Sequence, residues 1–274
     1  MPPQRERDPE PLLDTFGSEL RFRRVAAGLS RNKLAEALGC TGQWIGAVEF
    51  GDKPPSEEFA IDLDTFFDTG GLFHRLWEKV KKDRRKRALP QGFPGFLQME
   101  AAAASMQIFE VQLITGLLQT EDYAREVLLP VADPDKIEEL LAIRMERQKI
   151  LDQASAPRLW VVMDEAVLHR PIGGTKLMYA QLQHLAEAAL HPKIAIQVVA
   201  SHRGSYAGLE GSFTILSFHD GPDVAYVENS GTGWTIREPS AVGAYDVRFD
   251  LIRSAAKSDD ESLDLITAVM EKYA

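Results

Sequence analysis

The sequence has one cysteine, Cys40, and no apolar run long enough to cross a membrane. A single cysteine excludes an intrachain disulfide and favours a reducing compartment. A membrane-spanning helix needs about 20 apolar residues. The charged, proline-rich start, MPPQRERDPEP, is followed by no apolar stretch that could serve as a signal peptide. We therefore expect a cytoplasmic protein with no membrane partner.

The sequence also lacks the motifs on which many catalytic and metal sites depend. It has no His-x-x-x-His pair, no cysteine pair and no phosphate-binding loop, and Ser205 is displaced by one position from a nucleophile-elbow pattern. Asp164, Glu165 and His169 would place a carboxylate beside an imidazole. A helix start capped by Asp164 explains them better. We expect no catalytic residue, no metal, no cofactor and no enzyme activity.

Negative charge is concentrated in one part of the chain. The formal net charge is −10, but residues 1–90 carry 16 basic and 15 acidic side chains, whereas residues 91–274 carry 15 and 26. Screening limits the reach of a charge to about 10 Å at ordinary salt. An acidic second part therefore does not exclude a DNA-binding surface on the first part.

Residues 15–88 have the pattern of a compact all-α domain. Ser30, Thr41 and Ser56 are suitable N-caps, and Gly28 and Gly39 suit helix ends. We expect five short helices, at 16–27, 30–38, 41–50, from 56 to the turn at 69, and 72–87. The preceding residues, 1–14, are expected to be a disordered arm, and the Pro- and Gly-rich segment 89–95 a linker.

Residues 96–274 mix helical and extended patterns. We expect helices at 97–127, 133–152, 175–190, 240–256 and 259–272, and strands at 158–163, 193–200, 212–218, 224–228 and 234–237. This composition predicts an α+β domain with a small antiparallel sheet. The chain as a whole is then α+β, with a helical N-terminal domain followed by a regulatory and dimerisation domain.

The segment Leu29–Gly51, LSRNKLAEALGCTGQWIGAVEFG, resembles the helix-turn-helix of the Cro/phage-repressor type, or xenobiotic-response-element family. Small Ala35 allows the second and third helices to cross, and Gly39 makes the sharp turn between them. The apolar positions that anchor the two helices are Leu34, Leu38, Ile45 and Val48.

The resemblance implies that the third helix enters the major groove of double-stranded DNA. Gln43 would read a base, because its amide can pair bidentately with adenine. Arg31 and Thr41, at two helix starts, would contact phosphates, and Arg24 and Glu49 would form a structural ion pair. The full set of DNA-binding candidates is Arg31, Thr41, Gly42, Gln43, Trp44, Gly46, Ala47 and Lys53.

Several departures from the family pattern indicate that one copy of the domain binds DNA with modest affinity. Gly42 and Gly46 supply no reading side chains, Trp44 is expected to be exposed, and Asp52 stands where a basic residue is common. A homodimer, or a partner, would have to supply further contacts. The basic run Lys79–Arg87 is either a phosphate-contacting helix end or a solvated helix face.

Phrases in the second part are similar to the C-terminal domain of WhiJ-type, antitoxin-like actinobacterial regulators. They are ITGLLQTEDYAR (114–125), RMERQKIL (144–151), WVVMDEAVLHRP (160–171), GLEGSF (208–213) and VAYVEN (224–229). This resemblance implies a regulator commonly encoded beside a very small acidic partner protein. It supplies no ligand and no catalytic residue.

These observations predict a transcriptional regulator whose second domain receives a signal from a small partner protein or a ligand. The surface expected to bind the partner includes Tyr206, Gly208 and Phe213, because the glycine-rich loop 203–211 connects two expected strands. The alternative is an antitoxin that neutralises a small partner and represses its own operon. A third possibility, an enzyme joined to a DNA-binding domain, lacks a catalytic constellation.

Overall fold

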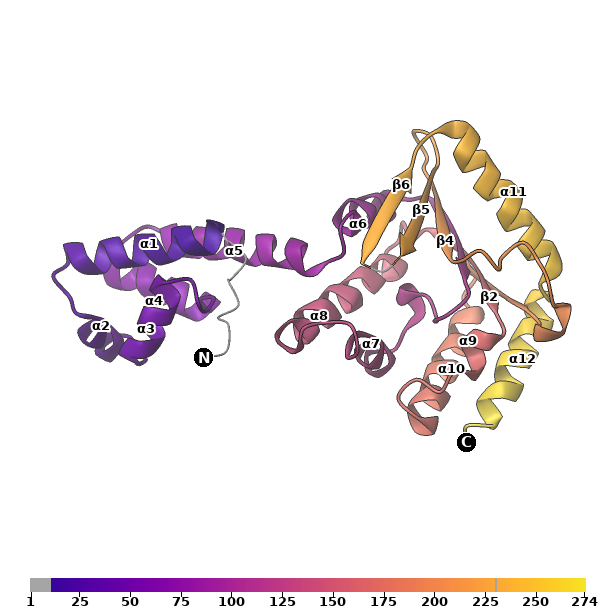
Figure 1. Cartoon of the computed structure of the whole chain (residues 1–274), viewed down its shortest axis with the longest axis horizontal. Helices are drawn as coiled ribbons and strands as arrows, with labels where there is room; N and C mark the ends of the chain where they lie inside the picture. The colour runs from indigo at the N-terminus through magenta and orange to yellow at the C-terminus, as the bar shows by residue number, and fades with distance from the viewer. Residues whose placement is uncertain (1–10, 230) are drawn as a thin grey trace, which may run out of the picture. The chain divides into compact units, whose positions relative to one another are not determined.

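A computed structural model describes residues 11–229 and 231–274, and the chain divides into two compact units, Met1–Arg87 and Ala88–Ala274 (Figure 1). The first unit is helical. Its helices are α1 Pro11–Ala26, α2 Arg31–Ala37, α3 Gly42–Glu49, α4 Glu57–Phe67 and α5 Leu72–Ala88. The expected five helices are therefore present.

Local capping explains where these helices begin and end. The side chains of Ser30, Thr41 and Ser56 each accept a hydrogen bond from the backbone N–H three residues further on. Gly28 and Gly39 have φ near +67° and +66°, a conformation that glycine adopts readily. These caps separate α1, α2 and α3 by turns of only a few residues.

Two expected boundaries differ in the structure. Helix α1 already begins at Pro11, so residues 11–14 of the expected disordered arm are helical, whereas residues 1–10 lie outside the described residues. The last three residues of the expected linker, 93–95, open helix α6, where Pro94 stands in the first turn. Proline fits there because the first helical N–H groups need no intrahelical partner.

The second unit contains a six-stranded mixed sheet with strand order β3-β2-β1-β4-β5-β6. Strands β1 to β3 are parallel, and the remaining neighbours are antiparallel. The strands are β1 Ser105–Glu110, β2 Arg158–Asp164, β3 Ile194–Val199, β4 Phe213–Ser217, β5 Val224–Asn229 and β6 Thr232–Ile236. The expected small antiparallel sheet is therefore wrong in both size and pairing.

Helices connect the parallel strands of this unit. The helices between β1 and β2, and those between β2 and β3, form the crossover connections that return the chain to a parallel strand. The α-helices are α6 Phe93–Ala102, α7 Glu121–Leu128, α8 Ile137–Gln148, α9 Ala166–His169, α10 Thr175–Ala189, α11 Pro239–Ala255 and α12 Asp259–Glu271, and the 3-10 turns are η1 Gly116–Leu118, η2 Pro134–Lys136, η3 Lys149–Asp152 and η4 Ser201–Arg203.

Apolar cores lie on both faces of the sheet. On one face, Ile108 and Val161 pack with residues of α6, α10 and α12. On the other face, Phe109 and Val162 pack with Phe249 and other residues of α11, which Figure 1 shows beside β4. Strand β1 is thus covered on both sides, as expected for a central strand of a layered fold.

Candidate nucleic-acid interface

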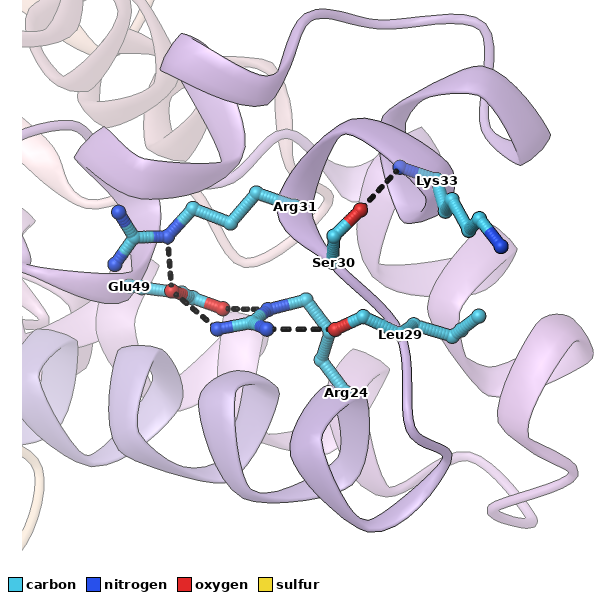
Figure 2. A network of polar contacts seen from close by, with 6 residues as sticks. All are labelled: Arg24, Leu29, Ser30, Arg31, Lys33 and Glu49. Carbon is cyan, nitrogen blue, oxygen red and sulfur yellow. Dashed lines mark hydrogen bonds and ion pairs between the residues drawn. The ribbon is translucent and has the colours of Figure 1, made fainter.

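The α2–α3 pair is held by a carboxylate that two arginines share. Glu49, at the end of α3, has a fully buried side chain, and Arg24 of α1 donates Nε to Oε1 at 2.5 Å and Nη2 to Oε2 at 3.1 Å. Arg31 of α2 donates Nε to Oε2 at 2.7 Å. Figure 2 shows the two guanidinium groups on either side of this carboxylate. The ion pairs connect α3 to both α1 and α2.

Further contacts hold the same arginines in place. Arg24 also donates Nη1 to the carbonyl of Leu29 at 2.8 Å, in the turn before α2, and the Arg31 guanidinium lies 4.9 Å from the centre of the Phe50 ring. Burial opposes ionisation of Glu49, but its hydrogen bonds and charge interactions with both arginines outweigh burial and lower its pKa. Glu49 is therefore ionised at neutral pH, and we call its ion pairs with Arg24 and Arg31 the Glu49 clamp.

Close backbone approach between α1 and α3 adds to this constraint. A Cβ at Gly17 would lie 2.6 Å from the carbonyl oxygens of both Val48 and Glu49. Buried Ile45 and Val48 join the core that includes Phe16 of α1. Helix α3 is thus fixed along one side and at its C-terminal end.

The opposite side of α3 carries the solvent-facing candidates. Thr41 and Gln43 are exposed, Ala47 is partly exposed, and Lys53 is exposed just beyond the helix. Thr41 Oγ1 accepts from the Trp44 backbone N–H at 3.2 Å, so its hydroxyl already caps α3. The exposed side chains of Thr41 and Gln43 therefore stand at the start of the helix, where the helix dipole favours an anion.

Three other candidates lie differently from the sequence-based expectation. Trp44 is partly buried and packs edge-on against Phe59, with ring centroids 4.4 Å apart, so it belongs to the domain core. Gly46 is buried beneath the Arg31 side chain, and a Cβ at Gly42 would collide with the Asn32 side chain. These two glycines allow neighbouring side chains to approach α3.

Two exposed polar residues were missed by the sequence reasoning. Lys33 and Asn32 of α2 are both exposed, and Asn32 lies directly against the start of α3. Figure 2 shows the Lys33 side chain extending away from the Glu49 clamp. The N-cap at Ser30 marks α2 in the sequence, so its first-turn polar residues were available as candidates.

The basic run Lys79–Arg87 lies in the second half of α5. Lys79, Lys81 and Lys82 are exposed, and the ammonium group of Lys81 lies 4.5 Å from the centre of the Trp77 ring. The side chains of residues 85–88 lie outside the described part. The described lysines fit a solvated helix face and are equally available to phosphates.

The expected partner-binding residues are mostly inside the second unit. Phe213 is only 4% exposed and packs with Phe109 and Phe249. Gly208 is buried, and a Cβ there would lie 2.3 Å from the Phe109 ring. Tyr206 is partly buried. Alternation on β4 turns Phe213 toward the core, so only Tyr206 remains partly accessible.

The polar residues after β2 have structural partners. Asp164 accepts from the Ala166 backbone N–H at 2.8 Å and from the Tyr206 hydroxyl at 2.6 Å. Glu165 accepts from the Ser201 backbone N–H at 2.7 Å and contacts His169 at 3.2 Å. They join α9 to the loop after β3. Within the described ranges, no group of three or more His, Cys, Asp or Glu residues could hold a metal ion.

Comparison with known families agrees with the two-unit organisation. A family model described as a helix-turn-helix domain matches residues 15–75, and one described as a domain of unknown function (DUF5753) matches residues 93–268. No curated protein and no solved structure matches the chain. In the described part, no helix combines the length and apolar character needed to cross a membrane.

The fold of the first unit and its family match define a DNA-binding regulator of the helix-turn-helix class. The second match extends over more than half of the chain. The protein therefore belongs to the DUF5753 family.

Proposed function

We propose that this protein is a sequence-specific transcriptional regulator that reads the major groove with α3. The observation that carries the proposal is the contrast between the two sides of α3. One side and the C-terminal end are fixed by Ile45, Val48 and the Glu49 clamp, whereas Thr41 and Gln43 face solvent at the other end. A rigid helix with polar residues at its exposed N-terminal end suits base reading.

The side chains divide into base-reading and phosphate-contacting groups. Gln43 is the proposed base reader, because its amide can donate to and accept from one adenine. Thr41, Lys33 and Lys53 are proposed to contact phosphates, which position the helix without reading sequence. Arg31 has its Nε committed to Glu49, so we propose that only its outer amino groups reach the backbone.

The small number of reading residues supports a homodimer. Gly42, Gly46 and Ala47 offer no hydrogen-bonding side chain, and one good bidentate contact discriminates by only about 1–3 kcal/mol. Two copies on a repeated site would double the specific contacts. The dimer-forming surface is proposed to lie in the second unit.

The second unit is proposed to receive the regulatory signal rather than to bind DNA or catalyse a reaction. Residues 91–274 have a net charge of −11, which repels phosphate at long range. The resemblance to WhiJ-type regulators supports a signal from a small acidic protein encoded nearby, and a small ligand is the other source. No observation on this chain favours the antitoxin alternative.

Binding measurements on the full chain test the DNA-reading role. Gln43→Ala is expected to weaken binding to a selected operator by about 1–3 kcal/mol and to change binding to unrelated DNA little. Thr65→Ala, an exposed polar residue on α4, is the matched control and should leave both affinities unchanged. Equal losses on the two DNAs would remove Gln43 from the base-reading role.

A further inference from the structure

Helix α8 presents a polar side to the body of the second unit. Its apolar residue Leu141 packs with Ala124 and Leu128 of α7. Arg144, Arg147 and Gln148, at spacings of three and four residues, lie together on another side. A helix usually buries apolar side chains on the side that packs against its domain, so this polar layer needs its own explanation.

Two side chains of this layer, Arg147 and Gln148, have ion-pair or hydrogen-bond partners within the unit. Arg147 makes a bidentate ion pair with Glu100 of α6, whose carboxylate is almost completely buried. Gln148 donates to the carbonyls of Gly116 and Gln119 at 2.8 and 2.7 Å. These contacts hold the last two turns of α8 against η1 and α6.

Two carboxylates face this helix from the sheet. Glu110 ends β1 on the same face as Ile108, and Glu228 of β5 is on the same face as Tyr226. Continuing the register of β4 with its two neighbours places Glu110 opposite Ser212 and Ser212 opposite Glu228. Strands lie about 4.8 Å apart, so the two glutamate backbones are separated by about 10 Å.

Glu110 and Arg144 are members of the layer that have hydrogen bonds but no ion pair, and the Glu110 carboxyl is hydrogen-bonded to the Ser212 side chain. Arg144 donates Nη1 to Gln119 Oε1 at 2.7 Å, and among the described residues neither Glu110 nor Arg144 has an oppositely charged side-chain atom within 4 Å. Both side chains are still partly open to solvent. Arg147 and Glu100, in the same layer, show that this fold can pair such charges directly.

The unpaired arrangement is electrostatically costly. Burial and, to a smaller extent, the Glu228 carboxylate raise the pKa of Glu110 to about 7, although a hydrogen bond with Ser212 and the charges of Arg147 and Arg144 act in the opposite direction. Burial also lowers the pKa of Arg144 to about 10. Desolvated charges without counter-ions destabilise a fold, and they occur preferentially at binding sites.

We propose that Glu110, Arg144 and Glu228 form a binding site for a small zwitterionic amino acid. Its carboxylate binds Arg144 on the helix side, and its ammonium group binds between Glu110 and Glu228 on the sheet side. A simple anion meets two carboxylates there, and a simple cation meets the guanidinium group, so each lacks one half of the site. The claim that this amino acid is the regulatory signal rests on the proposed function, whereas the claim that it binds the second unit does not.

Isothermal titration calorimetry on the full chain tests the site with the common L-amino acids as probes. Acetate and methylammonium, which each carry one of the two charges, are the mismatched probes. At least one amino acid is expected to bind with one-to-one stoichiometry. Glu110→Gln and Arg144→Gln should each weaken it about tenfold or more, because each removes a charge-assisted hydrogen bond.

Proton release provides a signature that a structural defect would not produce. An ammonium group beside Glu110 lowers its pKa, so binding at pH 7 should release about half a proton, since the unbound carboxyl is about half protonated there. Titration in buffers of different ionisation enthalpy measures this number. Glu110→Gln should abolish the release even at concentrations that saturate the variant.

The controls use an exposed ion pair of the same unit, Glu210 and Arg248, 2.6 Å apart. Glu210→Gln and Arg248→Gln should bind as the wild type does. Thermal melting checks that each site variant folds, and Arg144→Lys, which keeps the charge, replaces Arg144→Gln if that variant does not fold.

Three results would overturn the site: no amino acid binds the wild type, acetate or methylammonium binds as tightly as the amino acid, or both site variants bind normally. Operator binding measured with and without the amino acid tests its regulatory role separately. An unchanged operator affinity would contradict that role while calorimetry still supports the site.

Discussion

Replacement of Glu49 by glutamine tests whether the carboxylate clamp holds the DNA-reading helix in place. The Glu49 side chain is fully buried, and Arg24, its closest partner, has a side chain only 11% exposed. The glutamine keeps the size of the side chain but removes its charge, which leaves the Arg24 guanidinium buried without a counter-ion. Breaking one half of a buried ion pair costs about 3–5 kcal/mol.

The expected loss for Glu49→Gln is near the lower end of that range, about 3 kcal/mol, because glutamine retains one acceptor oxygen. Urea unfolding of the full chain measures it through tryptophan fluorescence. Trp160 and Trp234 are replaced by phenylalanine in every variant, so that the signal comes from Trp44 and Trp77 in the first unit.

Glu19→Gln is the matched control, because Glu19 and Arg23 form an ion pair at 2.7 Å with side chains 27% and 37% exposed. An exposed pair contributes about 0–1 kcal/mol. The lowered pKa of Glu49 means that its contribution is complete above its ordinary pKa of 4.5 and is lost as the pH falls through the folded-state value. The difference between wild type and Glu49→Gln should therefore narrow in acid. Equal losses for the two substitutions at neutral pH would refute the clamp.

The remaining predictions concern close packing. Gly17→Ala should destabilise the first unit by about 1–3 kcal/mol and weaken operator binding, because its Cβ meets carbonyl oxygens of α3; urea unfolding and operator titration measure the two effects. The Cβ added by Gly46→Ala meets only the flexible Arg31 side chain at 3.4 Å, so this variant should be at least as stable as the wild type. A loss of stability equal to that of Gly17→Ala would contradict the packing argument. Phe213→Ala should lower the stability of the second unit by about 3–5 kcal/mol, whereas Leu209→Ala, 61% exposed, should have little effect on thermal melting. A stable Phe213→Ala variant would restore the partner-surface interpretation.

The first unit follows closely from local sequence signals. Ser30, Thr41 and Ser56 cap helices within their own next turn, and Gly28 and Gly39 end helices through their own backbone conformation. These signals act over a few residues, so a sequence pattern contains them. The orientation of the Trp44 side chain could not be predicted from local signals, because it depends on Phe59 in a separate helix.

The sheet of the second unit depends on contacts that the sequence pattern does not contain. The helix expected at 97–127 is wrong over β1. This strand is buried on both faces, so Ile108 and Phe109 stand next to each other and the sequence shows no alternation of polar and apolar residues. Its parallel pairing with β2 joins residues about fifty positions apart. The missed strand also hid Glu110, which becomes a site candidate only when Arg144 and Glu228 are brought near it.

In vitro selection from random double-stranded DNA tests the central claim most directly. The full chain is predicted to enrich one motif, with two half-sites about 10 base pairs apart or a multiple of that spacing if it binds as a dimer. Gln43→Ala is predicted to enrich the same motif with the preference lost at one base pair of each half-site. Enrichment of no motif by the wild type, or of an unchanged motif by Gln43→Ala, would contradict DNA reading by α3.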